Sequence, residues 1–325
     1  MDDTRQDAVL VLKRREIAGL MRPADYLAAV EAAFRAAGET AAPAPMHLPV
    51  RGGGFHVKGA AGAGERPVAA FKINGNFPGN PAQGRPTIQG VIVLCDAADG
   101  AVLALLDSVE VTLRRTAAAT ALAARLLARP ESATLTVIGC GDQAAAQIEA
   151  LAEVLPLRRI YAYDTALERA EALRLGGGLR PEPVRDLRRA TLASDVIVTC
   201  TTARRPFLGP QDVAPGAFVA AVGADSPEKN EIAPALMARA MVVADVLAQA
   251  LAMGDLRHAV AAGAMRPDQV HAELAEVVAG FKPGRTDAES VTLFDSTGTA
   301  LQDLASAATI YRRAIAAGVG TAVRL

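Results

Sequence analysis

The sequence predicts an α/β protein that combines a Rossmann-type parallel sheet domain with a second, α+β domain. Its 325 residues correspond to about two domains at roughly 150 residues each. Apolar residues make up 51% of the chain and charged residues 21%, which is typical of globular proteins with a buried core. The pattern changes near Thr112, where glycine- and proline-rich sequence gives way to strands that alternate with helices.

Composition and charge exclude several classes of protein. The formal net charge is −1 without a basic run, so we expect no nucleic-acid partner. The first residues, MDDTRQDAVL, contain no charged region followed by an apolar one, so no signal peptide is expected, and the apolar runs are too short or too interrupted to cross a bilayer. We therefore expect no membrane partner and a cytoplasmic location. Three cysteines and four histidines form no ligand cluster, so we expect no metal.

The first part of the chain is expected to be α+β and mostly antiparallel. A helix is predicted near residues 23–37. The sequence Asp-Ala-Ala-Asp-Gly at residues 96–100 is typical of a β-hairpin loop. The expected strands of this part are residues 54–58, 68–73, 88–94 and 102–106.

The second part begins with an alanine- and leucine-rich helix, residues 112–128, which ends at Arg129-Pro130. Short apolar runs then alternate with helical segments, a pattern typical of βαβ units and of a parallel sheet buried on both faces. A last strand at residues 291–294 leads into a long helix at residues 300–317. The other expected strands are residues 135–138, 160–163, 196–199, 218–222 and 241–244.

The strongest local signal is the turn Gly139-x-Gly141-x-x-Ala144 between an expected strand and a helix at residues 145–155. Gly139 permits a tight turn, Gly141 lets the backbone approach a pyrophosphate, and the small Ala144 allows the helix to pack closely on the strand. The start of the helix, near Asp142 and Gln143, presents free N–H groups to phosphates. A glycine turn in an unrelated α/β domain is the alternative.

Asp164 ends the next expected strand, about 20 residues further on, as the dinucleotide fingerprint requires. Its carboxylate would accept hydrogen bonds from the adenosine ribose hydroxyls and would repel a 2′-phosphate. Because no arginine immediately follows it, NAD(H) is favoured, and NADP(H) stays open. The alternative role for Asp164 is to cap a helix at residues 166–173.

Further motifs occur along the chain in an order shared with a known protein family. They are Pro86-Thr-Ile-Gln-Gly, Leu-Leu-Asp107-Ser108, Thr112-Leu-Arg-Arg115-Thr116, Gly-x-Gly-x-Gln, Ala-Val-Gly223-Ala-Asp225 and Phe294-Asp-Ser296-Thr-Gly298. From about Phe71 to the last helix, the chain resembles the ornithine cyclodeaminase/mu-crystallin family. The resemblance implies a homodimer. It also implies a substrate-binding and dimerisation domain, residues 1–115 with 300–325, and a dinucleotide-binding Rossmann domain, residues 116–299.

Carried over residue by residue, the resemblance assigns roles. Lys72 and Arg115 would contact the carboxylate of a small imino or amino acid, with Thr87 beside them. Asp225 would be the acid/base group near the reacting carbon, and Lys72 is also a catalytic candidate. The cofactor would be held by Gly139, Gly141, Asp142, Gln143, Ala144 and Asp164, with Thr201, Gly223, Lys229 and Ser296 nearer the nicotinamide half.

The residues themselves are compatible with these roles. Lys72 ends an apolar run, and a cation at a strand end beside a loop can meet an anionic substrate; a solvated lysine is the alternative. Arg114 and Arg115 are adjacent on an apolar helix, so only one can point into a site, and a guanidinium can bond both oxygens of a carboxylate. Asp225 follows a strand at the sheet edge where ligands bind; capping a helix is the alternative.

The sequence departs from the cyclodeaminase pattern before the first hairpins. His47 replaces the family's loop arginine, unless Arg51 takes its place, and His56-Val-Lys58 replaces a Met-Pro pair. On a strand, His56 and Lys58 point to the same face, which adds polar groups where the cyclodeaminase pocket is more apolar. In this respect the chain is similar to members that reduce cyclic ketimines. Alternatively, His56 and Lys58 line the dimer surface.

One reaction is preferred over three alternatives. It is the NAD(P)H-dependent reduction of Δ1-pyrroline-2-carboxylate or Δ1-piperideine-2-carboxylate to L-proline or L-pipecolate, with Asp225 stabilising or protonating the imine. An ornithine cyclodeaminase would instead form L-proline and ammonia with the cofactor recycled. An amino-acid dehydrogenase and a non-catalytic, crystallin-like binder are the others. Lys72, Arg115 and Asp225 together argue against the binder.

Overall fold

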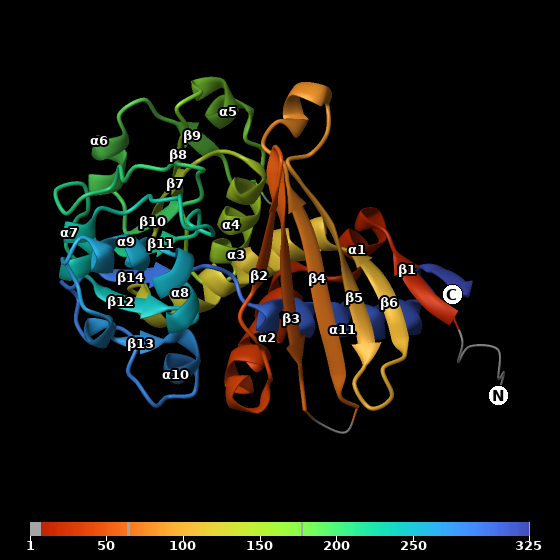
Figure 1. Ribbon diagram of the computed structural model, residues 1–325. Coiled ribbons are helices and arrows are strands. Elements are labelled where there is room, and N and C mark those ends of the chain that lie inside the picture. Colours follow the sequence, from red (N-terminus) through yellow and green to blue (C-terminus); the bar gives the residue numbers. More distant parts are fainter. Residues whose placement is uncertain (1–7, 64–65, 177, 325) are drawn as a thin grey trace. The chain divides into compact units, whose positions relative to one another are not determined.

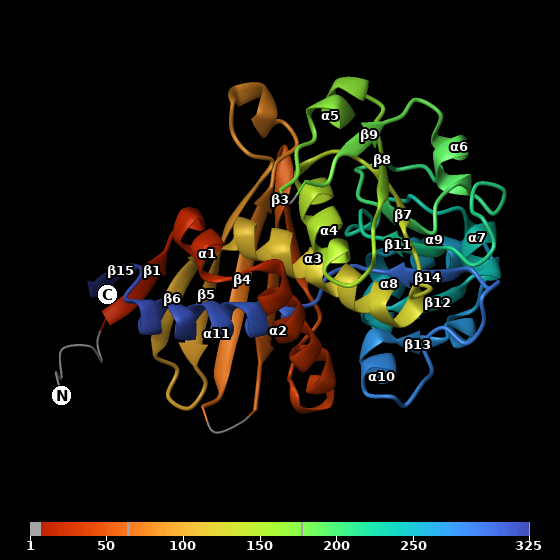
Figure 2. The ribbon, with the colours of Figure 1, turned by 180° about the vertical axis from the view of Figure 1, so that it is seen from behind.

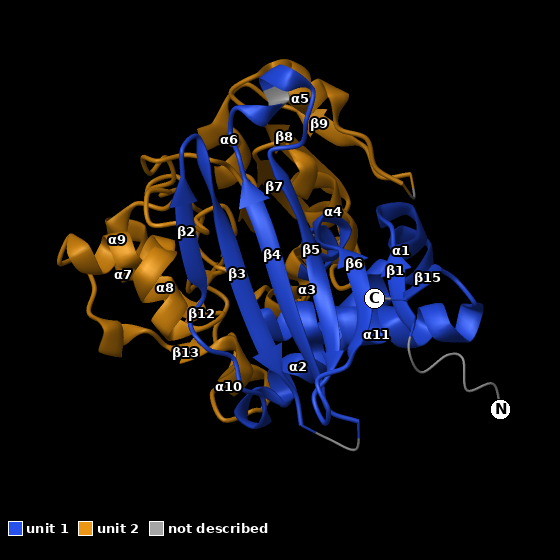
Figure 3. Cartoon of the chain, turned by 45° about the vertical axis from the view of Figure 1, so that its right-hand side comes forward, with its two compact units in different colours: residues 1–115, 299–325 blue, residues 116–298 orange. Residues whose placement is uncertain are grey.

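The computed structural model describes residues 8–63, 66–176 and 178–324 (Figure 1). The chain forms two compact units, which Figure 3 shows in different colours. Unit 1 contains Met1–Arg115 and Thr299–Leu325, and unit 2 contains Thr116–Gly298. Unit 2 is therefore one continuous stretch of chain, whereas unit 1 is assembled from the segments on either side of it.

Unit 1 is built on a 7-stranded sheet with the strand order β15-β1-β6-β5-β4-β3-β2. Neighbouring strands are antiparallel, except that β1 and β6 are parallel. The hairpin loop predicted at residues 96–100 joins β5 to β6. The strands are β1 (Ala8–Leu12), β2 (Met46–Val50), β3 (Gly53–Ala61), β4 (Val68–Asn76), β5 (Ile88–Asp96), β6 (Val102–Asp107) and β15 (Thr321–Arg324).

Helices α11 (Ala300–Ala317) and α2 (Pro23–Arg35) cover one face of this sheet, as Figure 2 shows. Pro23 lies in the first turn of α2, where its missing N–H breaks no helical hydrogen bond. Gly318 ends α11 in the left-handed conformation, at a φ of 64°. The unit also contains α1 (Arg14–Leu20), the 3-10 turns Ala37–Glu39 and Asn80–Gln83, and the start of α3 (Ser108–Leu127).

The two faces of the unit 1 sheet differ in chemistry, because successive residues of a strand point to opposite faces. On β4, Lys72 and Asn74 are buried, and Lys72 points to the face that α11 covers. Phe71 and Ile73 point to the other face and are exposed. The polar residues therefore lie on the side of α11, and an apolar surface forms on the opposite side.

Unit 2 is an 8-stranded sheet with the order β13-β12-β14-β11-β10-β7-β8-β9, in which every pairing is parallel. Its central strands are apolar and buried, as in a sheet covered on both faces. The strands are β7 (Thr134–Ile138), β8 (Arg159–Tyr163), β9 (Pro181–Pro183), β10 (Val196–Thr199), β11 (Phe218–Ala221), β12 (Met241–Ala244), β13 (Ala272–Glu273) and β14 (Thr292–Asp295). The helices, besides the rest of α3, are α4 (Asp142–Ala152), α5 (Leu167–Ala172), α6 (Leu187–Leu192), α7 (Pro234–Arg239), α8 (Leu247–Met253), α9 (Asp255–Ala261), the 3-10 turn Pro267–Gln269 and α10 (Leu274–Val278).

The predicted fold class, a Rossmann-type parallel sheet with an α+β partner, is confirmed. The strands expected at residues 196–199 and 241–244 and the helix at residues 300–317 coincide with β10, β12 and α11. The helix expected from Thr112 begins earlier, at Ser108, because the carboxylate of Asp107 accepts hydrogen bonds from the N–H groups of Val109 and Glu110 at 3.0 and 3.1 Å.

One predicted position is corrected. Lys72 was expected at a strand end, but β4 continues to Asn76, and both β3 and β5 pair with the stretch after Lys72. Glycine and asparagine in Ile73-Asn-Gly-Asn resemble a loop in the sequence, and the two flanking strands override that local preference. Lys72 is therefore an interior strand residue with a buried side chain.

Two further findings limit the classes of function. Of the helices that the structure describes, none is long and apolar enough to cross a membrane. Within the same residues, no group of three or more His, Cys, Asp or Glu side chains is arranged to hold a metal ion.

Candidate functional site

The glycine-rich turn joins β7 to α4 in unit 2. Gly139 has a φ of 94°, and a Cβ at this position would lie only 2.8 Å from the carbonyl oxygen of Cys200. Gly141 is the N-cap of α4, and no atom lies within 4 Å of the place where its Cβ would be. Ala144 is fully buried and lets α4 pack against the sheet. The open space at Gly141 and the free N–H groups of α4, which begins with Asp142 and Gln143, fit a pyrophosphate.

Asp164 follows β8 and fixes two turns. Its Oδ2 accepts a hydrogen bond from the N–H of Cys140 and its Oδ1 accepts one from the N–H of Ala166, both at 2.9 Å. The second bond forms a turn before α5 rather than a helix cap, because Ala166 is itself the N-cap residue. Asp164 also lines a cavity of about 370 Å³ in unit 2. The other lining residues are Ile138, Gly139, Gly141, Tyr163, Thr165, Arg169, Leu187, Cys200, Thr201, Thr202, Ala203 and Phe207.

The candidates for the nicotinamide half follow three neighbouring strands, β10, β11 and β14. The carboxyl ends of parallel strands form the edge at which such sheets bind ligands. Thr201 and Gly223 donate their N–H groups to the buried carboxylate of Glu231 at 2.7 and 2.8 Å. Ser296 is 2% exposed, and among the described residues its hydroxyl has no hydrogen-bond partner. A buried hydroxyl of this kind fits a site that a polar ligand completes.

Asp225 lies in the loop after β11. Its side chain is 47% exposed and forms an ion pair with Lys229 at 2.5 Å. Residues 222–230 form turns and irregular structure without a helix, so the helix-capping alternative is wrong. The structure thus brings together the acid/base candidate and one of the expected cofactor residues.

A buried ion cluster connects three elements of unit 1. The Nζ of Lys72 on β4 lies 2.7 Å from Oδ2 of Asp303 on α11. Arg115 on α3 donates from Nε to Oδ1 of Asp303 at 3.0 Å and from a terminal nitrogen to Oε1 of Gln302 at 2.7 Å. The side chains of Lys72, Arg115 and Asp303 are 3 to 5% exposed. Two cations thus share one carboxylate, and a second carboxylate, such as that of a substrate, would complete the charge balance of these three groups.

The two halves of this cluster titrate differently. Burial, and after it the charge of Arg115, lower the pKa of Lys72 to about 7, although Asp303 opposes both effects. Burial raises the pKa of Asp303, but Lys72 and Arg115 outweigh it and hold that pKa below its usual value. Asp303 is therefore ionised at neutral pH, whereas Lys72 can gain or lose a proton there. A lysine that titrates near neutrality suits proton transfer.

The neighbourhood of the cluster is polar and closely packed. Ser108 donates a hydrogen bond from its Oγ to Oδ1 of Asn74, and both residues are buried. Gly90 lies opposite Asn74 on β5, and a Cβ at Gly90 would collide with the Asn74 side chain. Only glycine leaves room for this amide, which shares the Lys72 face of β4.

The three residues that depart from the cyclodeaminase pattern lie on the same face of the sheet. Lys58 pairs across the strands with Lys72, and His56 pairs with His47 on one side and Asn74 on the other. The rings of His47 and His56 are stacked, with centroids 4.5 Å apart. Lys58 also contributes to lowering the pKa of Asp303, so its charge faces the ion cluster. This arrangement agrees with the prediction that His56 and Lys58 share a face.

The position of Thr87 differs from the expectation that it lies beside Lys72 and Arg115. The residue of β5 that pairs with Lys72 is Ile92, whereas Thr87 precedes the first residue of β5. That separation corresponds to about 16 Å along a strand. Within unit 1, Thr87 therefore does not lie beside Lys72, and its carbonyl accepts a hydrogen bond from the N–H of Phe77 at 2.9 Å.

Three residues that organise these groups, Asp303, Gln302 and Glu231, were not predicted from the sequence. Asp303 and Gln302 are separated from Arg115 by 188 and 187 residues, so local patterns cannot pair them. A signal was present, because Asp303 is the one acidic residue in the sequence of α11. Glu231 follows the motif that contains Gly223 and Asp225 closely in the sequence, but no role was predicted for it.

Comparison with known proteins places the chain among cofactor-dependent enzymes. The archaeal alanine dehydrogenase dimer with bound NAD superposes with a TM-score of 0.92 at 34% identity, over 98% of this chain and 99% of that one. The Δ1-pyrroline-2-carboxylate reductase of Thermococcus litoralis, solved with NADH and L-proline, gives a TM-score of 0.90 at 30% identity, over 97% and 100%. The iminosuccinate reductase of Paracoccus denitrificans is 36% identical over 327 residues, 98% of this chain and 100% of that protein.

The family resemblance is confirmed over nearly the whole length. The model of the ornithine cyclodeaminase/mu-crystallin family matches residues 7–318. The match includes the glycine-rich turn, the ion cluster on α11 and the loop that carries Asp225. The chain therefore belongs to the ornithine cyclodeaminase/mu-crystallin family.

Proposed function

We propose that this protein is an NAD(P)H-dependent reductase of α-imino acids, with the cyclic ketimines Δ1-pyrroline-2-carboxylate and Δ1-piperideine-2-carboxylate as substrates and L-proline and L-pipecolate as products. The observation that carries the proposal is the buried pair of cations, Lys72 and Arg115, around the single carboxylate of Asp303. The pair provides binding energy for a substrate carboxylate. Lys72, with a pKa of about 7, provides a group that can deliver a proton.

The proposed cofactor is NAD(H). Gly139, Gly141 and the start of α4 fit the pyrophosphate, and Asp164 lines the adjoining cavity, where its charge favours ribose hydroxyls over a 2′-phosphate. Arg169, which was not among the predicted site residues, lines the same cavity and would attract a phosphate. Asp164 thus favours NADH, whereas Arg169 makes NADPH the second cofactor to be tested. The relatives solved with NAD or NADH support this choice.

In the proposed mechanism the bound cofactor supplies a hydride for the imine carbon. Arg115 and Lys72 would orient the substrate through its carboxylate, which would join that of Asp303 around the two cations. The imine nitrogen needs a proton, because a protonated imine is the better electrophile. Asp225 would stabilise that cation or relay the proton, and Lys72 is the second group able to supply it.

A linear α-imino acid is the second candidate substrate. Alanine dehydrogenase and iminosuccinate reductase are 35 and 36% identical over 97 and 98% of this chain, whereas the Δ1-pyrroline-2-carboxylate reductase of Bacillus cereus is 33% identical over 78%. The chemistry is shared, since each candidate reaction joins or separates hydride and proton across a C=N bond beside a carboxylate.

The proposal is tested by the absorbance of reduced nicotinamide with purified protein. Cyclic ketimines, or pyruvate or oxaloacetate with ammonia, are mixed with NADH or NADPH, and L-ornithine is mixed with NAD. Loss of reduced cofactor in proportion to the amino acid formed is expected with the cyclic ketimines. Formation of L-proline and ammonia from L-ornithine with no net change in the cofactor would show a cyclodeaminase instead.

Substituting Asp225 by asparagine tests its acid/base role. Asparagine keeps the size of the side chain but removes the charge, so turnover is expected to fall ~10² to 10⁴-fold, while the Kd for NADH changes little. Because Asp225 is 47% exposed, stability should be retained, which a thermal melt would verify. Unchanged turnover in Asp225→Asn would remove this residue from the mechanism.

We also propose a homodimer formed through the face of the unit 1 sheet that points away from α11. Met46, Leu48, Phe55, Phe71 and Ile73 share that face and are 37 to 56% exposed. Large exposed apolar patches of this kind mark interaction sites, and a solved relative is a dimer.

Phe71→Glu would place a charge in this surface and is expected to convert the dimer to a monomer at micromolar concentration, as measured by analytical ultracentrifugation. Phe281→Glu is the matched control, because Phe281 is 83% exposed and belongs to unit 2. A monomeric wild-type protein, or a Phe71→Glu variant that dimerises as tightly as the control, would refute this interface.

A further inference from the structure

Glu231 joins three segments at the carboxyl edge of the unit 2 sheet through one buried carboxylate. Oε2 accepts hydrogen bonds from the hydroxyl of Thr199, the last residue of β10, at 2.7 Å and from the N–H of Gly223 at 2.8 Å. Oε1 accepts the N–H of Thr201 at 2.7 Å. Glu231 has no exposed surface. The loops that follow β10 and β11 are thus fixed by the same side chain.

The approach of this carboxylate requires the glycine at position 223. A Cβ on Gly223 would lie 2.5 Å from the carboxyl carbon of Glu231 and the same distance from the carbonyl oxygen of Thr201. Any other residue would push the two strand-end loops apart. Gly223 is therefore a steric requirement of the Glu231 contact as well as an expected cofactor residue.

Glu231 is itself held in place by a second buried acid. Its N–H donates to Oδ1 of Asp255 at 2.7 Å, and the N–H groups of Asp255 and Leu256 donate to Asp295 at 3.3 and 2.9 Å. Asp295 is the last residue of β14 and directly precedes Ser296. Three buried acids therefore connect the ends of β10, β11 and β14, from which the expected nicotinamide contacts project.

We propose that Glu231 is a positioning residue for the nicotinamide half of the cofactor, which rests on the dinucleotide binding proposed above. It holds the backbone of Thr201 and Gly223 so that these two loops keep one arrangement at the sheet edge. The N–H groups of both loops reach this one carboxylate. Removing it would leave the two donors unpaired and the loops free to move apart.

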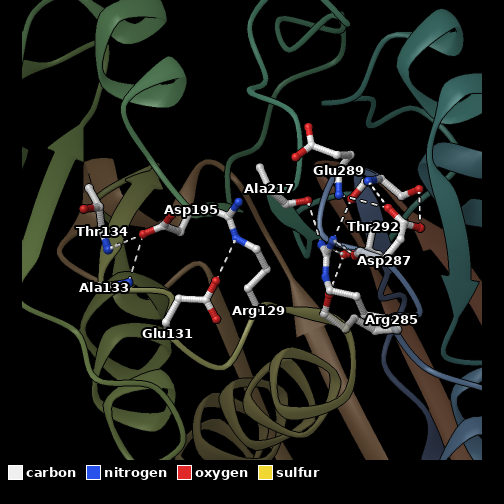
Figure 4. Close-up of polar contacts among 12 residues, drawn as sticks. Arg129, Glu131, Ala133, Thr134, Asp195, Ala217, Arg285, Asp287, Glu289 and Thr292 are labelled. Atoms are coloured by element: carbon white, nitrogen blue, oxygen red, sulfur yellow. Dashed lines mark hydrogen bonds and ion pairs between the residues drawn. The ribbon is translucent and has the colours of Figure 1, made fainter.

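A second carboxylate, at the opposite edge of the sheet, also accepts two backbone N–H groups and provides a control, although its side chain is 27% exposed. Asp195 directly precedes β10, and its Oδ2 accepts the N–H groups of Ala133 and Thr134 at 2.9 and 3.0 Å, while its Oδ1 accepts a hydrogen bond from Arg129 at 2.6 Å (Figure 4). Like Glu231, Asp195 joins two segments through backbone N–H groups. It does so at the amino-terminal ends of β7 and β10, away from every expected cofactor residue.

The test compares Glu231→Gln with Asp195→Asn in the full-length protein. Each change keeps one carbonyl oxygen and places an NH2 group against N–H donors. NADH binding is measured by fluorescence titration without substrate, and the melting temperature without cofactor. Both variants should have a lower melting temperature than the wild type. Only Glu231→Gln should raise the Kd for NADH, by ~10-fold or more, as expected for the loss of charge-assisted hydrogen bonds. Glu231→Asp, which keeps the charge, should recover part of the affinity.

The outcomes separate this role from the proposed function. If Glu231→Gln does not fold, Thr199→Val removes one of the three hydrogen bonds and is expected to raise the Kd for NADH by a smaller factor. Wild-type affinity in Glu231→Gln or in Thr199→Val, or an equal loss of affinity in Asp195→Asn, would overturn the role of Glu231 alone. A wild-type protein that binds neither NADH nor NADPH would overturn the proposed cofactor and, with it, this role.

Discussion

Replacing Lys72 with methionine is expected to lower kcat/KM for the imino acid by ~10³-fold, within the range of a lost proton donor that also binds substrate. Methionine keeps the length of the side chain and fills the same buried space on β4. Asp303 would still be paired with Arg115 at 3.0 Å, so no buried charge loses its last partner. The melting temperature should therefore fall little, and steady-state kinetics with NADH would show the loss.

The control for this substitution is Lys282→Met, which changes an exposed lysine of unit 2. It should leave kcat/KM unchanged. Activity within threefold of the wild type in Lys72→Met would exclude Lys72 from both carboxylate binding and proton transfer. A large loss of melting temperature would show that the lysine is mainly structural.

Asp303→Asn is expected to have the largest effect on stability, about 3–5 kcal/mol in the free energy of unfolding. The change removes the one carboxylate that Lys72 and Arg115 share, so Arg115 remains a buried cation without a counterion and Lys72 is driven to lose its proton. Urea unfolding followed by circular dichroism would measure it. Asp25→Asn is the matched control, because Asp25 pairs with Arg313 on the same helix, α11, but Arg313 is 42% exposed. That change should cost about 1 kcal/mol or less.

Asp303→Asn also tests the role of Lys72 as a proton donor, through the dependence of kcat/KM on pH. In the reducing direction a protonated Lys72 is needed, so kcat/KM should fall as pH rises through a pKa of about 7. Asp303 raises this pKa by stabilising the charged lysine, and its replacement by asparagine should lower it. The alkaline limb of the profile is therefore expected to move to lower pH in Asp303→Asn and to stay in place in Asp25→Asn. An unmoved limb would show that another group limits the rate.

Lys72 also makes stability depend on pH, with a sign that follows from its lowered pKa. Between about pH 7 and the ordinary lysine pKa of 10.5, the unfolded chain binds a proton that the native protein does not. The contribution of Lys72 to the free energy of unfolding therefore rises with pH across this window. Asp303, whose pKa is lowered, contributes stability above its ordinary pKa that is lost as the pH falls.

The parts of the fold that local sequence specifies were predicted well. The turn from Gly139 to Ala144 has steric requirements that only particular residues meet, so a short motif identifies it. The buried central strands are continuous apolar runs. By contrast, β1 and the edge strand β15 are short, and they pair with each other from opposite ends of the chain. Such pairing leaves no local trace.

The site was predicted only in part, because its contacts also depend on pairing between distant segments of the chain. Lys72, Arg115 and Asp225 belong to recognisable motifs, but what they contact could not be deduced. Asp303 meets Arg115 across 188 residues, and the burial of Lys72 depends on two flanking strands that convert a loop-like sequence into the interior of β4. Long-range pairing therefore decides the electrostatics of this site.

The position of α11 at the end of the chain has a consequence for biosynthesis. Chains emerge from the ribosome amino terminus first, and domains fold as units during synthesis. Unit 2, which ends at Gly298, is complete before Asp303 has been made. Until α11 has been synthesised, Lys72 and Arg115 lack the carboxylate of Asp303. Burying them in unit 1 before then would leave a charge unpaired. The carboxylate site therefore forms after unit 2, and a chain that stops before Asp303 would lack it even when its Rossmann unit is folded.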